Sequence, residues 1–138
     1  LRAPLLRALP KSGERIPAVG LGTWLTFHVD IGDAPAMARR KAVLERFFAG
    51  GGRVVDSSPM YASAEQVLGV LLGEIAPAPP VFVAGKVWTP LGGAGAAQAE
   101  RSLALWRRPR FDLLQIHNLL AWREHLPTLQ ALQAQGRA

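Results

Sequence analysis

The sequence contains no cysteine, which excludes disulfide bonds and metal sites built on thiolates and leaves the redox compartment open. It has no apolar run near the ~20 residues that a membrane-spanning helix needs, and no signal-peptide pattern at its start. We therefore expect no membrane insertion. The cytoplasm is the default location, and the periplasm becomes the expectation if an export signal lies upstream of Leu1.

Charged residues are also scarce, at 19% of 138 residues, whereas 49% of the residues are hydrophobic. That balance argues against disorder and is enough to build a packed domain. The net charge of +6 does not come from one basic patch, because the lysines and arginines are scattered. The densest group, at 107–110, is interpreted as a solvated loop, so we expect no nucleic-acid partner.

Three short apolar runs, at 53–56, 81–86 and 111–117, each end in a polar residue. The three end residues are 30 and 31 positions apart, and a strand–helix–strand unit takes roughly 30 residues. The period therefore predicts parallel strands, each followed by a helix that returns across the sheet.

Segments of helical composition lie between and after these runs. The first of them ends at three consecutive glycines, a stop signal, and the second has Ser63 and Gln66 placed for a capping box. The start of the chain predicts a β-hairpin and then one more strand. The expected helices cover 35–49, a stretch that follows Ser63, 96–106 and 127–135; the hairpin pairs 5–9 with 15–19, and the strand covers 18–22.

These elements predict an α/β fold, made of the N-terminal β-hairpin and the first four β/α units of a TIM (β/α)₈ barrel. Such a barrel takes about 250 residues. We therefore expect residues 1–138 to be the N-terminal half of a single barrel domain, truncated before strand five. As an isolated fragment the chain would expose two sheet edges and should aggregate. A solution in which it stayed monomeric and cooperatively folded would contradict this.

Candidate catalytic residues follow from the same pattern. Asp56, Lys86 and His117 end the three runs, and parallel strands bring their carboxyl ends to one face. Tyr61, the only tyrosine, follows Asp56 in the loop that leaves its strand. An ammonium beside the phenol should lower the pKa of Tyr61, the Asp56 carboxylate can balance Lys86, and the imidazole can bind a carbonyl oxygen. The set predicts a proton donor aimed at a carbonyl group.

Four stretches of the chain resemble the aldo-keto reductases, in the order and spacing of that family. Each stretch is weak alone, but together they span nearly the whole chain. The residue Asn118 places the chain nearer to the bacterial branch of the family. The stretches are Ile16 to Trp24, which includes the Gly20-Leu21-Gly22-Thr23 run; Asp56-Ser57-Ser58-Pro59-Met60-Tyr61, with Glu65 and the Leu68-Gly69 pair after it; Lys86-Val87-Trp88; and Gln115-Ile116-His117-Asn118.

The resemblance implies an enzyme that reduces an aldehyde or ketone to an alcohol by hydride transfer from NADPH, with NADH as the alternative cofactor. Tyr61 would be the general acid, Asp56 and Lys86 would tune it, and His117 would orient the carbonyl of a small-molecule substrate. In this family most contacts to the adenosine, the pyrophosphate and the 2′-phosphate come from the second half of the barrel. We therefore expect residues 1–138 alone to lack turnover.

Further contacts come from the same resemblance. Gly22, Thr23 and Trp24 would lie beside the nicotinamide, with Asp56 close to it. Trp24, Trp88 and His117 would line the substrate pocket, and no metal would be required.

Two other functions stay open at this point. The family includes barrels that bind NADPH and act as non-catalytic accessory or sensing subunits of membrane channels. Another class of barrel, such as an isomerase or aldolase, could use Lys86 as a Schiff-base amine. The sequence leaves the substrate, the stereochemistry, the direction of reaction and the oligomeric state undetermined.

Other polar and aromatic residues receive structural interpretations. His28 and His125 lack partners at metal-ligand spacing and are interpreted as surface residues. Trp106 and Trp122 are interpreted as helix packing, and Glu65 as a charge at a helix N-terminus. The glycine-rich stretch at 92–95 is predicted to be a flexible loop.

Overall fold

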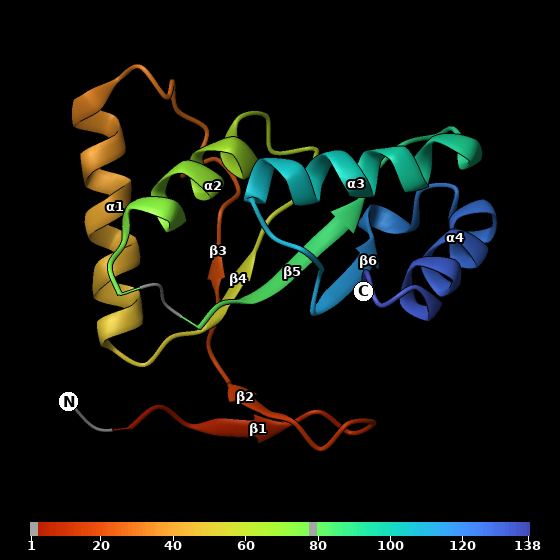
Figure 1. The fold of residues 1–138 in the computed structure, drawn as a ribbon, viewed down its shortest axis with the longest axis horizontal. Helices are drawn as coiled ribbons and strands as arrows, with labels where there is room; N and C mark the ends of the chain where they lie inside the picture. Colours follow the sequence, from red (N-terminus) through yellow and green to blue (C-terminus); the bar gives the residue numbers. More distant parts are fainter. Residues whose placement is uncertain (1–2, 78–79) are drawn as a thin grey trace.

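The main sheet of the protein has four parallel strands whose order in the sheet is their order in the chain. The computed structural model describes residues 3–77 and 80–138. Because each strand pairs in parallel with the next, the predicted succession of parallel strands is confirmed. The strands are β3 (Leu21–Gly22), β4 (Val54–Asp56), β5 (Phe82–Val87) and β6 (Leu113–Ile116) (Figure 1).

The strand ends differ from the prediction in small ways that matter for the site. β5 continues to Val87, which pairs with Ile116, so Lys86 lies inside the strand and not at its end. His117 follows β6 and opens the short 3₁₀ turn η2 (His117–Leu119). The first strand is shorter than predicted, because only two residues of β3 pair with β4.

The predicted β-hairpin is confirmed and lies at the amino-terminal end of the main sheet (Figure 1). β1 (Leu6–Ala8) pairs antiparallel with β2 (Arg15–Pro17). Gly13 takes a φ of +73° in the connecting turn, a conformation that glycine adopts without strain. The hairpin therefore lies at the opposite end of the strands from Asp56.

Within the described residues, four α-helices alternate with the strands, as the period predicts. They are α1 (Ala34–Ala49), α2 (Ala64–Glu74), α3 (Gly95–Trp106) and α4 (Trp122–Ala134). α1 begins where the Asp33 carboxylate accepts a hydrogen bond from the backbone N–H of Ala36 at 2.9 Å, and it ends at Gly50. This is the alternation of the first units of a (β/α)₈ barrel.

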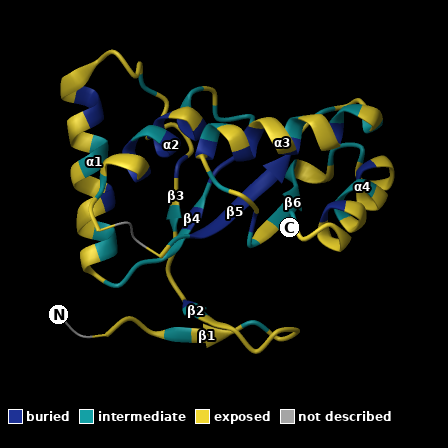
Figure 2. Cartoon of the chain, viewed as in Figure 1, coloured by how far each residue is buried: buried dark blue, intermediate teal, exposed yellow. Residues whose placement is uncertain are grey.

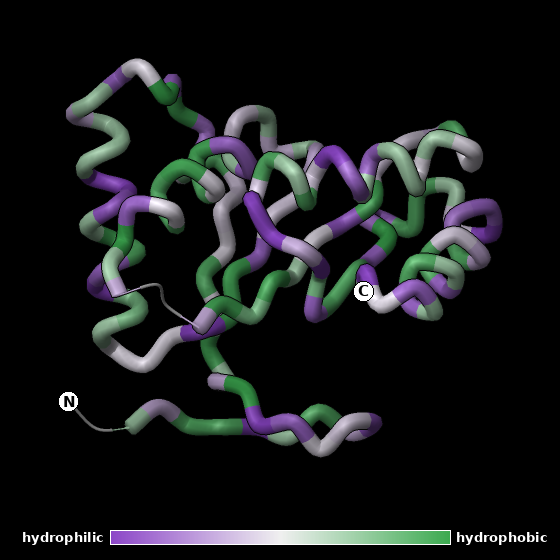
Figure 3. The backbone as a smooth tube through the Cα atoms, in the orientation of Figure 1, coloured by the Kyte–Doolittle hydropathy of each residue, from purple (hydrophilic) through white to green (hydrophobic). Residues whose placement is uncertain are grey.

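The core lies between the sheet and the helices α1, α2 and α3. Every residue of β5 is buried, and the buried faces of the helices turn toward it (Figure 2). Hydrophobic residues lie along the strands and also along the helices that cover them (Figure 3). Full burial of one such side chain stabilises the fold by about 1.5–3 kcal/mol. The largest wholly buried side chains include Leu44, Leu68, Leu103, Trp106 and Phe111.

Helices α2 and α3 cross in close contact at Gly69. A Cβ atom at this position would lie 1.8 Å from the carbonyl oxygen of Leu105, so only glycine fits. Trp106 is wholly buried at the same crossing, which confirms its predicted role in helix packing.

One predicted capping bond is absent, and one predicted helix start is wrong. α2 begins after Ser63 as predicted, but Ser63 makes no capping bond to it, because its hydroxyl donates to the Val29 carbonyl oxygen at 2.8 Å and ties the loop between β3 and α1 to this helix. α4 begins at Trp122 and not at Pro127. Pro127 lies in the second turn of α4, where it has no N–H to donate to the carbonyl of Arg123.

The prediction that His125 lies on the surface is also wrong, because this side chain is wholly buried. Its Nε2 lies 2.8 Å from the Thr89 carbonyl oxygen, and a Cβ at Gly95 would lie 2.6 Å from its Nδ1. His125 therefore ties α4 to the segment after β5. Part of that segment, predicted as a flexible loop, forms the 3₁₀ turn η1 (Gly92–Ala94).

In the part of the chain that the structure describes, no helix has the length and apolar character needed to cross a membrane. Residues 3–77 and 80–138 also hold no group of three or more His, Asp or Glu side chains that could bind a metal ion.

Candidate active site

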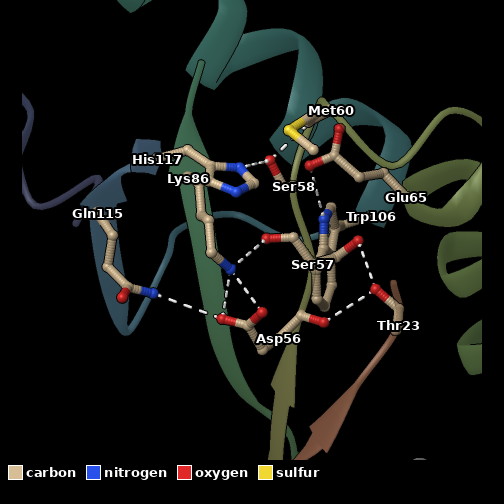
Figure 4. Close-up of polar contacts among 10 residues, drawn as sticks. All are labelled: Thr23, Asp56, Ser57, Ser58, Met60, Glu65, Lys86, Trp106, Gln115 and His117. Atoms are coloured by element: carbon tan, nitrogen blue, oxygen red, sulfur yellow. Dashed lines mark hydrogen bonds and ion pairs between the residues drawn. The ribbon is translucent and has the colours of Figure 1, made fainter. Parts of the chain in front are cut away.

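An ion pair between Asp56 and Lys86 lies at the carboxyl end of the sheet (Figure 4). The Lys86 Nζ is 2.5 Å from each carboxylate oxygen of Asp56 and donates to the Ser57 carbonyl oxygen at 3.0 Å. Lys86 is only 9% exposed, and a charge that is buried this far needs such partners. The contact joins two of the four predicted catalytic residues.

The strand register explains why these side chains meet. Asp56 pairs with Ala84, and Lys86 lies two residues further along β5, so both side chains project from the same face of the sheet. Lys86 pairs in turn with Gln115, and His117 lies two residues beyond it. The side chains of three consecutive strands therefore point toward one region.

Gln115 belongs to this cluster and was missed in the sequence analysis. Its Nε2 lies 3.4 Å from the Asp56 Oδ2, on the carboxylate that already accepts from Lys86. The sequence does indicate this position. Gln115 is a polar residue inside an apolar strand, and it lies two residues before His117, so the two side chains are expected on the same face of the sheet.

Tyr61 lies against the other predicted catalytic residues from its loop after β4. The centre of its ring is 5.6 Å from the Lys86 Nζ and 5.5 Å from the centre of the His117 ring, which it meets edge-on. The Trp24 ring packs on it at 5.0 Å, also edge-on. The structure thus brings a phenol, an ammonium, a carboxylate and an imidazole together.

The pKa of Tyr61 is raised above its ordinary value, first by burial and then by the negative charge of Asp56. This direction is opposite to the one predicted from the sequence. The Lys86 ammonium is held by the Asp56 carboxylate, and in the described chain it makes no hydrogen bond to the phenol oxygen. The phenol therefore stays protonated at neutral pH and is available as a proton donor.

His117 is half-buried and is held by Ser58. The Ser58 Oγ lies 2.6 Å from the Nδ1 of His117 (Figure 4). Burial and the nearby Lys86 charge lower the pKa of His117, against a smaller opposite effect of Asp56. The imidazole is therefore neutral at neutral pH. Ser58 lies in one of the stretches that carry the family resemblance, but the sequence analysis gave it no role.

The predicted cofactor residues lie at the end of β3, beside the same site. Thr23 is wholly buried, and its Oγ1 lies 2.9 Å from both the Asp56 carbonyl oxygen and the Ser57 Oγ. Gly22 is exposed, and a Cβ there would meet no atom within 4 Å. Trp24 is exposed by 47% although its ring touches Tyr61.

Trp88 follows β5 and is 38% exposed. Its backbone N–H donates to the Gln98 Oε1 at 2.6 Å, and its carbonyl oxygen accepts from the Gln98 Nε2 at 2.7 Å. This double contact fixes the backbone where the chain leaves the strand that carries Lys86.

Glu65 lies at the N-terminus of a helix, as predicted, and it also makes contacts that the sequence did not indicate. It lies in the first turn of α2, but it is only 2% exposed and links two helices. Its carboxylate accepts from the Ser102 Oγ at 3.1 Å and from the Trp106 Nε1 at 3.2 Å, both on α3. Burial raises the pKa of Glu65 despite these bonds. It therefore serves the helix layer and not the site.

Comparison with known proteins agrees with this architecture. The sequence model of the aldo/keto reductase family matches residues 18–137. Among solved structures, an aldo/keto reductase from Klebsiella pneumoniae in complex with NADP and acetate is 25% identical, with a TM-score of 0.74, over 91% of this chain and 44% of its own. A protein of Pseudomonas aeruginosa described as an aldo-keto reductase is 24% identical, with a TM-score of 0.79, over 99% and 60% of the two chains.

A thermostable aldo-keto reductase in complex with the inhibitor epalrestat is also 24% identical, with a TM-score of 0.79, over 96% and 51% of the two chains. The chain thus spans about half the length of the solved structures that it matches. The TIM-barrel fold class is confirmed, with the first four β/α units present. Because the family model covers almost all of the sequence, the chain belongs to the aldo/keto reductase family.

Proposed function

We propose that the whole protein reduces an aldehyde or ketone to an alcohol with NADPH, and that residues 1–138 are the N-terminal half of its barrel domain. The observation that supports this best is the meeting of Tyr61, the Asp56–Lys86 pair and His117 at the carboxyl ends of parallel strands. Relatives from Klebsiella pneumoniae are named as complexes with NADP and with NADPH, which favours this cofactor over NADH.

Tyr61 is the proposed proton donor. Its raised pKa keeps the proton on the phenol oxygen until a carbonyl oxygen with growing negative charge accepts it. The phenolate left behind needs a positive charge nearby, and the Lys86 ammonium lies 5.6 Å from the ring centre. Asp56 keeps this ammonium in place through both carboxylate oxygens.

His117 is proposed to orient the substrate. Its Nδ1 is occupied by Ser58, which leaves Nε2 as the ring nitrogen that can reach a carbonyl oxygen beside Tyr61. A neutral imidazole can donate this hydrogen bond without delivering its own proton.

The end of β3 suits the nicotinamide end of the cofactor, which would supply a hydride to the carbonyl carbon when bound. The open space at Gly22, next to the exposed Trp24 ring, can accept a flat ring. The Thr23 hydroxyl is engaged by Asp56 and Ser57, so Thr23 would contribute by fixing this strand end. Asp56 would lie close to the nicotinamide through its place at the end of β4.

The substrate pocket is proposed to lie between Trp24, Trp88 and His117. Both tryptophans are large apolar side chains with more than a third of their surface exposed. Exposed aromatic side chains beside polar groups are typical of a binding site for a small organic molecule.

The experiment that tests this proposal follows the hydride. The whole protein is mixed with NADPH deuterated at the transferred position and with a panel of small aldehydes and ketones. We expect NADPH consumption and deuterium on the carbinol carbon of the product. The Tyr61→Phe variant serves as the matched control, because it lacks only the phenol oxygen.

Two results would contradict the proposal. NADPH binding without transfer to any carbonyl would favour an accessory or sensing subunit. Borohydride trapping of a substrate on Lys86, without NADPH consumption, would favour a Schiff-base enzyme of the same fold.

A further inference from the structure

Ser58 lies two residues beyond β4 and is wholly buried. Buried hydroxyl groups are hydrogen-bonded in folded proteins, and a buried donor that is left without an acceptor costs free energy. The polar partners of the Ser58 hydroxyl group therefore determine which atom accepts its proton.

The Ser58 oxygen has two polar partners in the described chain. The backbone N–H of Met60 donates to it at 3.2 Å, and the Nδ1 of His117 lies 2.6 Å away. The Met60 N–H cannot accept a proton. Among residues 3–77 and 80–138, the Nδ1 of His117 is thus the acceptor available to the Ser58 hydroxyl proton.

From this count we infer that Ser58 is a positioning residue, which donates to Nδ1 and holds His117 in the neutral tautomer with its proton on Nε2. The role of that proton rests on the proposed function, because Nε2–H is the donor that a carbonyl substrate requires. Ser58 itself touches no reacting atom, since its side chain is covered on all sides.

The opposite arrangement is unfavourable on two grounds. If Nδ1–H donated to Ser58, the serine oxygen would accept two hydrogen bonds and its own proton would have no partner in a dry site. The Nε2 would then be an acceptor and would repel a carbonyl oxygen. The tautomer is therefore set by a group that the substrate never meets.

The neighbouring Ser57 provides a matched control. It is also wholly buried, but its hydroxyl contacts the Thr23 Oγ1 at 2.9 Å and not the imidazole. Ser57→Ala removes the same atom one residue away, so it reports the general effect of losing a buried hydroxyl on the His117 ring.

The test is ¹⁵N NMR of the histidine rings at a pH where His117 is neutral. The sequence has three histidines, and the His117 signals are assigned by their loss in His117→Gln. We expect Nδ1 at the shift of an unprotonated nitrogen and Nε2 at the shift of a protonated one. In Ser58→Ala both shifts should move toward a tautomer-averaged position, and in Ser57→Ala they should not.

A kinetic measurement on the whole protein sharpens the test. Ser58→Ala should lower kcat about five- to tenfold, the size of one lost hydrogen bond, with the KM for NADPH unchanged. Ser58→Thr, which keeps the hydroxyl, should restore both the spectrum and the rate.

Three outcomes overturn the inference: a protonated Nδ1 in the wild-type protein, a spectrum that Ser58→Ala leaves unchanged, or equal shifts in Ser58→Ala and Ser57→Ala. The first measurement needs no substituted serine, so a variant that fails to fold does not remove the test. The spectrum tests the tautomer, and the activity assay tests the proposed function. If the tautomer depends on Ser58 but the whole protein has no reductase activity, the proposed function is wrong, and so is the proposed use of Nε2–H as a donor to the substrate.

Discussion

The carboxyl end of the sheet and the interface between α2 and α3 each hold one acidic side chain, and the two are stabilised in different ways. Asp56 meets an ammonium, with the Lys86 Nζ 2.5 Å from both carboxylate oxygens. Glu65 meets only neutral donors, a serine hydroxyl and an indole N–H. The Asp56 side chain is 34% exposed, whereas Glu65 is 2% exposed.

This difference indicates that Asp56 belongs to the candidate active site, whereas Glu65 stabilises the packing of two helices. The Asp56 carboxylate holds an ammonium next to the phenol that we propose as the proton donor. An acid among neutral donors loses much of its solvation, so its pKa rises and it acts as a link between helices. We therefore expect substitutions at the sheet end to change rates, and substitutions at Glu65 to change stability.

The largest effect is expected from Tyr61→Phe. Removing the proton donor should lower kcat for carbonyl reduction by about 10²- to 10⁴-fold, the usual contribution of a general acid. NADPH binding, measured by quenching of tryptophan fluorescence, should stay nearly unchanged. Wild-type rates in this variant would defeat the assigned role of the phenol.

Lys86→Met should have the next largest effect, a loss of about 10²-fold in kcat, because the phenolate would lose its positive neighbour. The uncompensated Asp56 charge should raise the pKa of Tyr61 further, since Asp56 already raises it. We therefore expect the basic limb of the pH–rate profile to move to higher pH. A profile that moves to lower pH would contradict this electrostatic account.

Glu65→Ala should act on folding. It would leave the Ser102 hydroxyl and the Trp106 indole N–H without their partner in a buried interface, at a cost of about 2 kcal/mol in the free energy of unfolding. Urea denaturation of the whole protein measures this difference. If the variant is fully folded but has lost activity, Glu65 contributes to the active site and the stability account of this residue is wrong.

Glu65→Gln should have the smallest effect, and it should depend on pH. The pKa of Glu65 is raised in the folded protein, so its contribution to stability is fully present below the unfolded pKa of about 4.5 and is lost as pH rises through the folded pKa. The wild-type protein should therefore lose stability relative to the glutamine variant across that window. A constant difference between the two unfolding free energies would contradict the raised pKa.

Much of the fold could be predicted because its signals are periodic. The spacing of Asp56, Lys86 and His117 indicates parallel strands. Because side chains alternate between the two faces of a strand, the register places these three side chains on one face. The three glycines after α1 mark its end correctly. Patterns of this kind need no knowledge of tertiary contacts.

The remaining features depend on contacts between distant residues. His125 is buried against the Thr89 carbonyl oxygen and Gly95. The Ser63 hydroxyl donates to the Val29 carbonyl oxygen and makes no capping bond to its own helix. Proline is common at the first position of a helix, which is why the sequence predicts a start at Pro127, but α4 begins at Trp122 and contains the proline. The pKa of Tyr61 is raised first by burial and then by the charge of Asp56, and both depend on tertiary contacts that only the structure supplies.

The central claim is that Asp56 and Lys86 act as one unit beside the phenol. A double-mutant cycle on kcat/KM with Asp56→Asn, Lys86→Met and the combined variant tests it most directly. We expect the combined variant to be about as slow as the slower single variant, because breaking the pair once removes its effect. If the two losses multiply instead, the residues act independently and the account is contradicted.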